Sequence, residues 1–306
     1  MSPSLIRYAI FRRRRPEERV LTSATRDLLF ANEMPGSVIA VQHIRRMRGG
    51  AQGHLTRCSD GHFYVVKFQN NPQHIRVLAN ELLATRLAER IGLSVPQVRV
   101  VEVTEWLIRN TNELTIETGA MSRRCADGLQ FGARFVVDPF DGQVFDYLPE
   151  GALERVTNVR EFAGMLCLDK WTCNTNGRQA VFSRKSRERN YRATFIDQGY
   201  CFNAGEWTFP DAAMRGVYAR NDVYKHVRGW DDFEPWLSGV EKLSDDAIAD
   251  CADGIPPEWC GDTGELERVI TELMKRRSRV RDLITMFREC SREPFPLWTR
   301  AQVAVQ

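Results

Sequence analysis

Hydrophobic residues in the first half of the chain gather in short runs, which polar and glycine-containing segments separate. The second and third of these runs flank Ser59-Asp60-Gly61, and an Asp-Gly turn in this position favours a β-hairpin. Enrichment in β-branched and aromatic residues is typical of strands. We therefore predict strands in the runs at 38–41, 54–58, 63–68, 98–103 and 128–137.

One predicted helix interrupts this β-rich half. From residue 77 to 91 apolar residues such as Leu78 and Leu82 recur at helical spacing, and Gly92 stands where a helix is expected to end. Glu81 lies inside this apolar pattern. The pattern therefore predicts a helix that carries one carboxylate in an otherwise apolar neighbourhood.

Lys67 interrupts the apolar strand run at 63–68. A buried ammonium without a partner costs several kcal/mol, so Lys67 needs either a carboxylate or a path to water. The helical Glu81 is the partner that we expect, and the pair would aim the ammonium at nucleotide phosphates. The alternative is a lysine on an edge strand, whose ammonium reaches solvent along its apolar stem.

The second half of the chain has mainly helical spacing. Two predicted strands in it are joined by a basic segment at 183–190. The predicted helices lie at 159–168, 244–251 and 265–288, and the two strands at 179–182 and 191–196.

Turn signals at Asp138-Pro139 and Asp141-Gly142 place the boundary between the halves near 135–142. The expected fold is α+β and bilobal, with a small β-rich lobe that carries one key helix and a larger, mainly helical lobe. The predicted divisions are an N-terminal extension at 1–36, a small lobe at 37–137 and a larger lobe at 138–306.

Composition narrows the class of protein. The 306 residues are 43% hydrophobic and 27% charged, with a net charge of +3, as expected of a soluble globular protein. The eight cysteines are dispersed, without a Cys-x-x-Cys pair, and no zinc-ligand spacing joins them to the histidines. We predict reduced thiols in a cytoplasmic protein. No apolar stretch suits a secretion signal or a membrane-spanning helix.

Two basic segments raise the alternative of nucleic-acid binding. Arg12–Arg15 is followed by two glutamates, and residues 184–189 form the tip between two predicted strands. The overall charge lacks a strongly basic footprint, so direct binding to nucleic acid is disfavoured. Such binding would weaken steeply with salt.

The glycine-rich segment Gly49-Gly50-Ala51-Gln52-Gly53 is a candidate phosphate-binding loop. Glycine lets the backbone approach a ligand closely, and successive backbone amides in such a turn can face a phosphate. The alternative is a flexible hairpin loop. The segment lacks the Lys-Ser or Lys-Thr of a Walker A sequence, so a P-loop nucleoside triphosphatase is disfavoured.

Three oxygen-bearing side chains of the second half have the spacing of a phosphotransfer site. Asp169 is followed five residues later by Asn174, and Asp197 closes an apolar strand with Gly199 two residues on. In protein kinases an Asp of the catalytic loop orients the acceptor, while a later Asn and the Asp of Asp-x-Gly hold magnesium. Mg²⁺ needs only one or two protein oxygens. Asp-x-Gly alone is weak evidence, because any turn can carry it.

Taken together, five segments resemble the HipA-like kinases of bacteria, over roughly residues 37–290. The segments are Gly50-Ala51-Gln52, Val66-Lys67-Phe68, Asn80-Glu81-Leu82-Leu83, Leu168-Asp169 with Asn174, and Ile196-Asp197-Gln198-Gly199. The resemblance implies a protein-kinase-like fold with ATP and Mg²⁺ as cofactors. It implies that Lys67 binds phosphates, that Glu81 positions Lys67, that Asp169 is the catalytic base, and that Asn174 and Asp197 hold magnesium.

The chain departs from this family where relatives carry a His two residues after the catalytic Asp. Trp171 occupies that position here, and Lys170 is the candidate that could supply a positive charge instead. The resemblance also raises an antitoxin-like partner, which no sequence feature supports. We expect transfer of the ATP γ-phosphoryl group to a hydroxyl, first of all Ser or Thr of a protein. The alternatives are a nucleotide-binding pseudokinase that acts as an interaction module and a small-molecule phosphotransferase.

Overall fold

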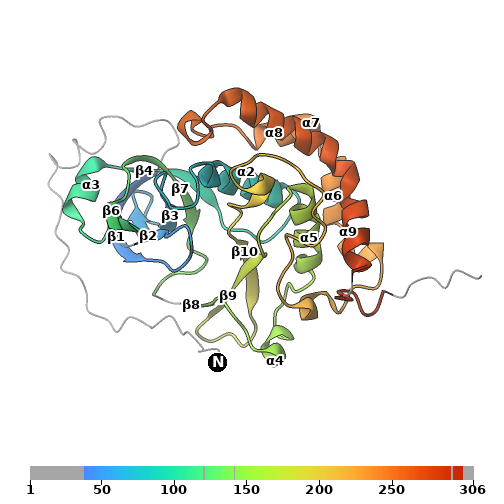
Figure 1. Ribbon diagram of the computed structural model, residues 1–306. Helices are drawn as coiled ribbons and strands as arrows, with labels where there is room; N and C mark the ends of the chain where they lie inside the picture. The colour runs from blue at the N-terminus through green and yellow to red at the C-terminus, as the bar shows by residue number, and fades with distance from the viewer. Residues whose placement is uncertain (1–37, 120, 141, 291, 299–306) are drawn as a thin grey trace, which may run out of the picture.

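A computed structural model describes residues 38–119, 121–140, 142–290 and 292–298. The predicted N-terminal extension at 1–36, with its arginine run, lies outside the described residues. A β-barrel forms one side of the molecule and a mainly helical part forms the other (Figure 1). The α+β, bilobal arrangement expected from the sequence is thus confirmed. The predicted divisions at residues 37 and 138 stay predictions.

The barrel contains the strands predicted in the first half. Its strands follow the order β1-β2-β3-β7-β4, and the parallel pair of β1 with β4 closes it. The β2–β3 hairpin turns at residues 59–61 as predicted, with Arg57 opposite Phe63. The bounds are β1 Val38–Arg46, β2 His54–Cys58, β3 Phe63–Lys67, β4 Val98–Val103 and β7 Gly128–Arg134.

Helix α2 (Arg76–Arg90) confirms the predicted helix, and Gly92 follows it with a left-handed φ of 80°. It lies between the barrel and the helical part (Figure 1), and contacts β4, β7 and α5. Leucines such as Leu78 and Leu82 are fully buried in the large core that spans both parts. The helix therefore fixes the barrel to the rest of the molecule.

Three elements beside the barrel were not predicted. They are α3 (Glu105–Asn110), β5 (Thr115–Thr118) and β6 (Met121–Arg124), of which β5 and β6 form a separate two-stranded sheet. All four residues of β6 are exposed and polar or basic apart from Met121. A strand without a buried face has no alternating pattern, so its sequence carries no signal.

The second part contains a three-stranded antiparallel sheet in the order β10-β9-β8. Both predicted strands of this sheet are confirmed, and β8 is an addition. Helices pack beside the sheet, with segments of 3₁₀-helix between them (Figure 1). The bounds are β8 Gly142–Phe145, α4 Glu150–Leu153, α5 Glu161–Trp171, β9 Gln179–Lys185, β10 Arg192–Ile196, α6 Trp236–Lys242, α7 Asp245–Asp250, α8 Thr263–Arg276 and α9 Val280–Arg288. The 3₁₀ segments are Cys201–Asn203, Asn221–Tyr224, Trp230–Phe233, Pro257–Trp259 and Arg277–Arg279.

The predicted single helix at 265–288 is wrong in one respect. The structure breaks it at Arg277–Arg279 into α8 and α9. Helix α8 contacts α7, whereas α9 packs against α5 with Leu283 and Ile284 buried. One straight helix could not follow both surfaces, and hydrophobic spacing alone does not reveal the change of direction.

Helix α5 is the centre of the helical part, and its residues 162–171 are all buried. A helix that is apolar on every side belongs inside a core. Gly164 allows close packing, since a Cβ there would lie 2.3 Å from the Trp236 ring of α6. None of the helices in the described part of the chain has the length and apolar character that crossing a membrane requires. All eight cysteines lie within the described ranges and are free thiols.

Candidate active site

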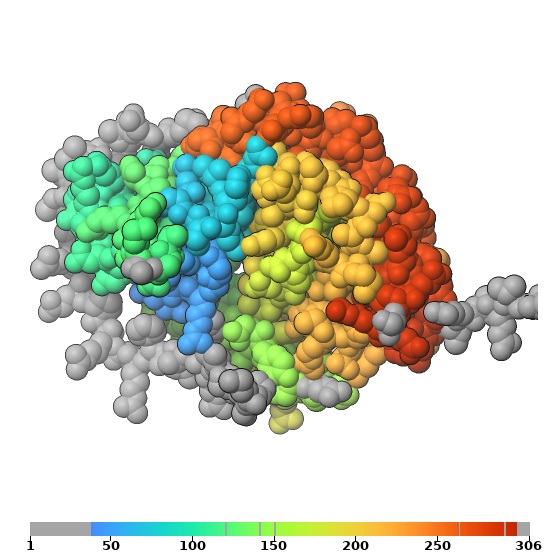
Figure 2. Space-filling view, in the orientation of Figure 1, coloured from blue at the N-terminus to red at the C-terminus, as the bar shows by residue number. Residues whose placement is uncertain are grey.

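A cleft of about 350 Å³ lies between the barrel and the β8–β10 sheet. Figure 2 shows the surface hollowed between the blue strands of the barrel and the yellow-green segment of the second part. Apolar side chains from both parts line its walls. They include Val65, Phe131, Phe135, Val144, Val181 and Ile196. Lys67, Glu81 and Asp197 line the same cleft. An apolar slot with a few convergent charged groups is the usual form of a small-molecule site.

Lys67 joins two carboxylates at this end of the cleft. Its ammonium donates to Glu81 and, at 2.8 Å, to Oδ1 of Asp197. Glu81 also accepts the backbone N–H groups of Gln198 and Gly199, each at 3.0 Å. The predicted Lys67–Glu81 ion pair is thus confirmed. Through the two backbone bonds, the Glu81 carboxylate also holds the turn that carries Asp197.

Lys67 and Asp197 stabilise each other's charged forms, whereas burial raises the pKa of Glu81. Burial alone would lower the pKa of Lys67, but Glu81 and Asp197 outweigh it, so the Lys67 pKa is raised. Burial alone would raise the pKa of Asp197, but the neighbouring Lys67 ammonium holds that pKa below its ordinary value. Near neutral pH the cluster therefore presents an ammonium and an ionised Asp197 to the cleft.

The turn after β10 aims Asp197 into the cleft. Asp197 has a left-handed φ of 64°, which Asp tolerates better than most residues. Gly199 lies so close to α2 that a Cβ there would stand 2.6 Å from Val77 Cγ1 and 3.3 Å from Glu81 Oε1. The glycine of Asp-x-Gly is therefore required for contact with α2.

Asn80, next to Glu81 on α2, holds the following segment. Its side-chain NH₂ donates to the carbonyl oxygens of Gly199, Cys201 and Ala204, and its Oδ1 accepts the Trp207 indole N–H at 2.7 Å. The sequence placed Asn80 in the helix without a role. A buried Asn beside a buried Glu in an apolar helix was the signal that could have found it.

All five residues of the glycine-rich segment 49–53 line the cleft. Gln52 has a left-handed φ of 49°, and its N–H donates to the Gly49 carbonyl at 3.1 Å, so the segment is a defined turn. The Gln52 side chain accepts the Glu117 N–H at 2.8 Å and donates to the Glu117 carbonyl at 2.6 Å. The β5–β6 sheet thereby fixes the loop, contrary to the alternative of a flexible hairpin.

The structure does not bring the carboxylate of Asp169 into the cleft. Asp169 lies in the last turn of α5, and its side chain is only 1% exposed. Arg178, equally buried, donates to both of its oxygens, and Asn174 donates to Oδ1 at 2.9 Å. Gly216 covers the pair, since a Cβ there would lie 3.0 Å from Asp169 Cβ. This carboxylate is sealed, which opposes its predicted role as a base.

Arg178 links this sealed pair to the cleft. Its Nη1 donates to the Ile196 carbonyl at 3.0 Å and to the side chain of Gln198. The two acceptors are the residues directly before and after Asp197. The pairing of Arg178 with Asp169 was not predicted, although a lone arginine close after Asp169 and Asn174 is a natural partner for a buried carboxylate. Arg178 thereby links Asp169 to the residues on both sides of Asp197.

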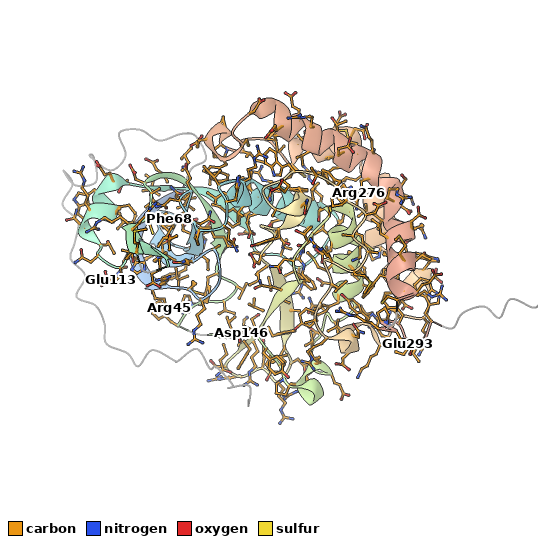
Figure 3. All side chains as sticks on the ribbon, viewed as in Figure 1. Arg45, Phe68, Glu113, Asp146, Arg276 and Glu293 are labelled. Carbon is orange, nitrogen blue, oxygen red and sulfur yellow. The ribbon has the colours of Figure 1, made fainter. Side chains whose placement is uncertain are left out.

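Asn174 and Lys170 are also engaged away from the cleft. Asn174 is buried, and while its NH₂ donates to Asp169, its Oδ1 accepts the Asn176 N–H at 3.0 Å. Lys170 donates to the carbonyl of Arg215, and burial lowers its pKa to about 8. Arg276 of α8, labelled in Figure 3, donates to the Lys170 carbonyl at 3.1 Å. The predicted metal and charge roles of Asn174 and Lys170 do not fit these positions.

Trp171 is a core residue. Its ring is fully buried, and its indole N–H donates to the carbonyl of Leu273 on α8 at 2.8 Å. It therefore faces the C-terminal helices, and it is not among the residues that line the cleft.

Gln179 and Asp146 also line the cleft, although the sequence did not indicate them. Gln179, the first residue of β9, donates from its side-chain amide to Oδ2 of Asp197. Asp146 follows β8 and lines the cleft with an exposed side chain (Figure 3). A Gln at the start of a predicted strand and an Asp in a turn-rich connector gave no distinctive signal in the sequence.

The cleft suits a hard cation that accompanies phosphates. Within the described ranges, no group of three or more His, Cys, Asp or Glu side chains gathers to hold a metal on protein ligands alone. Mg²⁺ takes most of its oxygens from water and phosphate, so an ionised Asp197 and one further oxygen fit this use. The residues present are thus compatible with a cation that arrives with a nucleotide.

Comparison with known proteins agrees with this geometry. The sequence model of the HipA-like kinase family matches residues 40–138, and comparison with curated proteins finds no match. The Helicobacter pylori proinflammatory kinase CtkA is 12% identical, with a TM-score of 0.52, and the match covers 84% of this chain and 98% of that one. Fam20 of hydra, solved with sugar, is 10% identical, with a TM-score of 0.51, over 83% of this chain and 87% of that one.

At such low identity the solved structures speak for the fold alone, and the family match covers the glycine-rich loop, Lys67 and Glu81. Together they support a kinase-type phosphotransferase. The protein therefore has a kinase-like fold, and its resemblance to the HipA-like kinases is confirmed.

Proposed function

We propose that this protein is an ATP-dependent kinase that transfers the γ-phosphoryl group to a hydroxyl, in the first place Ser or Thr of a protein, with Mg²⁺. One observation carries the proposal. Lys67, Glu81 and Asp197 meet at the end of an apolar cleft that the glycine-rich loop borders. The protein acceptor rests on the family resemblance alone.

The nucleotide would bind with its base between the apolar walls, which include Val65, Phe131 and Val181. Lysine has three N–H donors, and Lys67 uses two of them for Glu81 and Asp197. The third is available for a phosphate oxygen. Glu81 holds the ammonium in place, and backbone amides of residues 49–53 can face the phosphates from the other side.

Transfer of a phosphoryl group depends mainly on positioning and on stabilising the transferred charge. A magnesium ion held at Asp197 would neutralise the phosphate charge that develops. The turn at 197–199 is fixed from two directions, by Glu81 of α2 and by Arg178 with Asp169. We assign Asp169 to this positioning role, because its carboxylate is sealed from the cleft.

Incubation with γ-labelled ATP and Mg²⁺ tests the proposal. The wild-type protein is expected to label a protein or a small hydroxyl compound in a lysate, and Asp197→Ala is expected to reduce labelling by about 10²-fold or more. Asp169→Asn, with ADP affinity measured in parallel, separates a positioning role from misfolding. Labelling that survives Asp197→Ala would contradict the proposed site.

A second function is favoured by the sealed carboxylate of Asp169. A pseudokinase would bind nucleotide in the same cleft without turnover, because no base at Asp169 reaches an acceptor. This alternative predicts Mg²⁺-dependent ADP binding that Lys67→Met weakens, with neither labelled product nor free phosphate. The kinase proposal requires both binding and product, so the two measurements together separate the functions.

A further inference from the structure

The Asp197 carboxylate has a neighbour that the kinase spacing did not indicate. Lys67 donates to its Oδ1, and the side-chain amide of Gln179 donates to its Oδ2. The contact is fixed by the sheet, because Gln179 of β9 lies directly opposite Ile196, the residue before Asp197. The side chain of Gln179, the first residue of β9, thus contacts Asp197, the candidate metal ligand.

Two other oxygen-bearing side chains that the kinase spacing indicated, those of Glu81 and Asn174, are engaged. Glu81 accepts from Lys67 and from two backbone N–H groups. Asn174 is buried, and its amide bonds to Asp169 of α5 at one end and to the Asn176 N–H at the other. Asp146 follows Phe145, which pairs with Phe182 three residues along β9 from Gln179. Gln179 is exposed and lines the cleft.

We propose that Gln179, through its side-chain carbonyl oxygen, is the second protein ligand beside Asp197 for the divalent cation that accompanies the nucleotide, in place of Asn174. This inference rests on the proposed function. Rotation about the last side-chain bond exchanges the NH₂ for the carbonyl oxygen at the same point, so no change of backbone is needed. Carboxylate and amide oxygens are the ligands that a hard cation accepts.

The assignment also explains the position of Gln179 relative to the cleft walls. Val181, two residues along the same strand, lines the apolar part of the cleft, since residues i and i+2 share a face. One face of β9 therefore offers an oxygen beside Asp197 and an apolar surface for the base. Both would contact parts of a single bound nucleotide.

Titration of ADP by calorimetry, with and without Mn²⁺, tests the assignment in wild type, Gln179→Ala and Gln179→Glu. The matched control is Gln143→Ala on β8, whose side chain accepts from Arg184 and is not among the cleft-lining residues. Bound Mn²⁺ is followed in parallel by its electron paramagnetic resonance. Neither measurement depends on turnover.

We expect Gln179→Ala to lower the Mn²⁺-dependent ADP affinity by at least about tenfold, a loss found even for residues that only support a metal ligand. Affinity for ADP without metal should stay unchanged, and Gln179→Glu should hold Mn²⁺ at least as tightly as wild type. An equal loss with and without Mn²⁺ would overturn the assignment, since Gln179 would then contact the nucleotide and not the metal. Weaker Mn²⁺ binding in Gln179→Glu would overturn it as well, since Gln179 would then act only as a donor to Asp197. Wild-type binding that ignores Mn²⁺ would instead overturn the metal requirement of the proposed function.

Discussion

Lys67 is largely buried and Lys170 is fully buried, and their surroundings shift their pKa in opposite directions. Lys67 sits between Glu81 and Asp197, and its pKa is raised. Lys170 donates to a backbone carbonyl, and burial lowers its pKa to about 8, although Asp169 partly opposes the shift. The difference comes from the partner, because a carboxylate compensates the lost hydration of an ammonium and a carbonyl does so only in part.

The two ion clusters of the site also differ in exposure to solvent. Lys67 belongs to the first cluster, and Lys170 follows Asp169 of the second. In the cleft cluster, the side chains of Lys67 and Asp197 are 14% and 19% exposed, so a ligand can reach them. In the sealed cluster, the Asp169 and Arg178 side chains are each 1% exposed. The first cluster is open to a ligand, whereas the second is closed and contacts the first through the bonds of Arg178 to Ile196 and Gln198.

The largest expected effect on stability comes from opening the sealed cluster. Arg178→Met leaves the Asp169 carboxylate buried with Asn174 as its remaining side-chain donor, which should lower the free energy of unfolding by about 3–5 kcal/mol. Urea denaturation measures the change. The control Arg192→Met removes a largely exposed arginine that lies 3.9 Å from Glu161, and it should change stability by less than about 1 kcal/mol. Equal effects of the two variants would contradict the description of the cluster as sealed.

Removing the cation of the cleft cluster should act on binding. Lys67→Met is expected to weaken ADP affinity by about 10- to 100-fold, since a charge-assisted hydrogen bond contributes about 1.5–3 kcal/mol. Its stability loss should be smaller than that of Arg178→Met, because Glu81 keeps two backbone donors. Calorimetry with Mg²⁺ and ADP gives the affinity, and Lys185→Met, an exposed residue at the end of β9, is the control. An unchanged affinity would remove Lys67 from the site.

A methyl group at Gly199 would push apart the turn and the helix that the cleft cluster joins. Gly199→Ala brings Cβ within 2.6 Å of Val77 Cγ1, and such crowding costs about 1–3 kcal/mol. ADP affinity should fall as well, since Glu81 and Asp197 move relative to each other. The matched control is Gly151→Ala, where a Cβ meets nothing within 4 Å. Thermal unfolding of the two variants should therefore differ, and similar melting temperatures would show that the contact yields easily.

Lys170 is expected to add a pH dependence to the stability of the protein. Its pKa is about 8 in the folded protein, against 10.5 ordinarily, so between these values the unfolded chain binds more protons. The Lys170 contribution to the free energy of unfolding therefore rises with pH there, by up to about 1.4 kcal/mol per pH unit. Lys170→Met should remove this contribution. The measurement is the difference between variant and wild type in urea denaturation from pH 7.5 to 9.5, and parallel curves would contradict the shift.

Local patterns in the sequence determined much of the framework. The Asp60-Gly61 turn and its flanking runs gave the β2–β3 hairpin, and the apolar spacing before Gly92 gave α2. An interrupted apolar strand and an acid in an apolar helix also predicted the Lys67–Glu81 pair, because each charge needed a partner in a buried setting. The fully exposed β6 and the break between α8 and α9 left no such signal.

Tertiary structure decided which carboxylates face the cleft. In the sequence, Asp169 and Asp197 look alike, since each is an aspartate at the end of an apolar element. In the folded protein, Asp169 is buried against Arg178, whereas Asp197 faces the cleft beside Gln179. The physical reason is that a motif fixes the order of groups along the chain, whereas access to a ligand depends on neighbours brought from elsewhere. Arg178 and Gln179 acquire their roles only when β9 pairs with β10 and places them against the turn at Asp197.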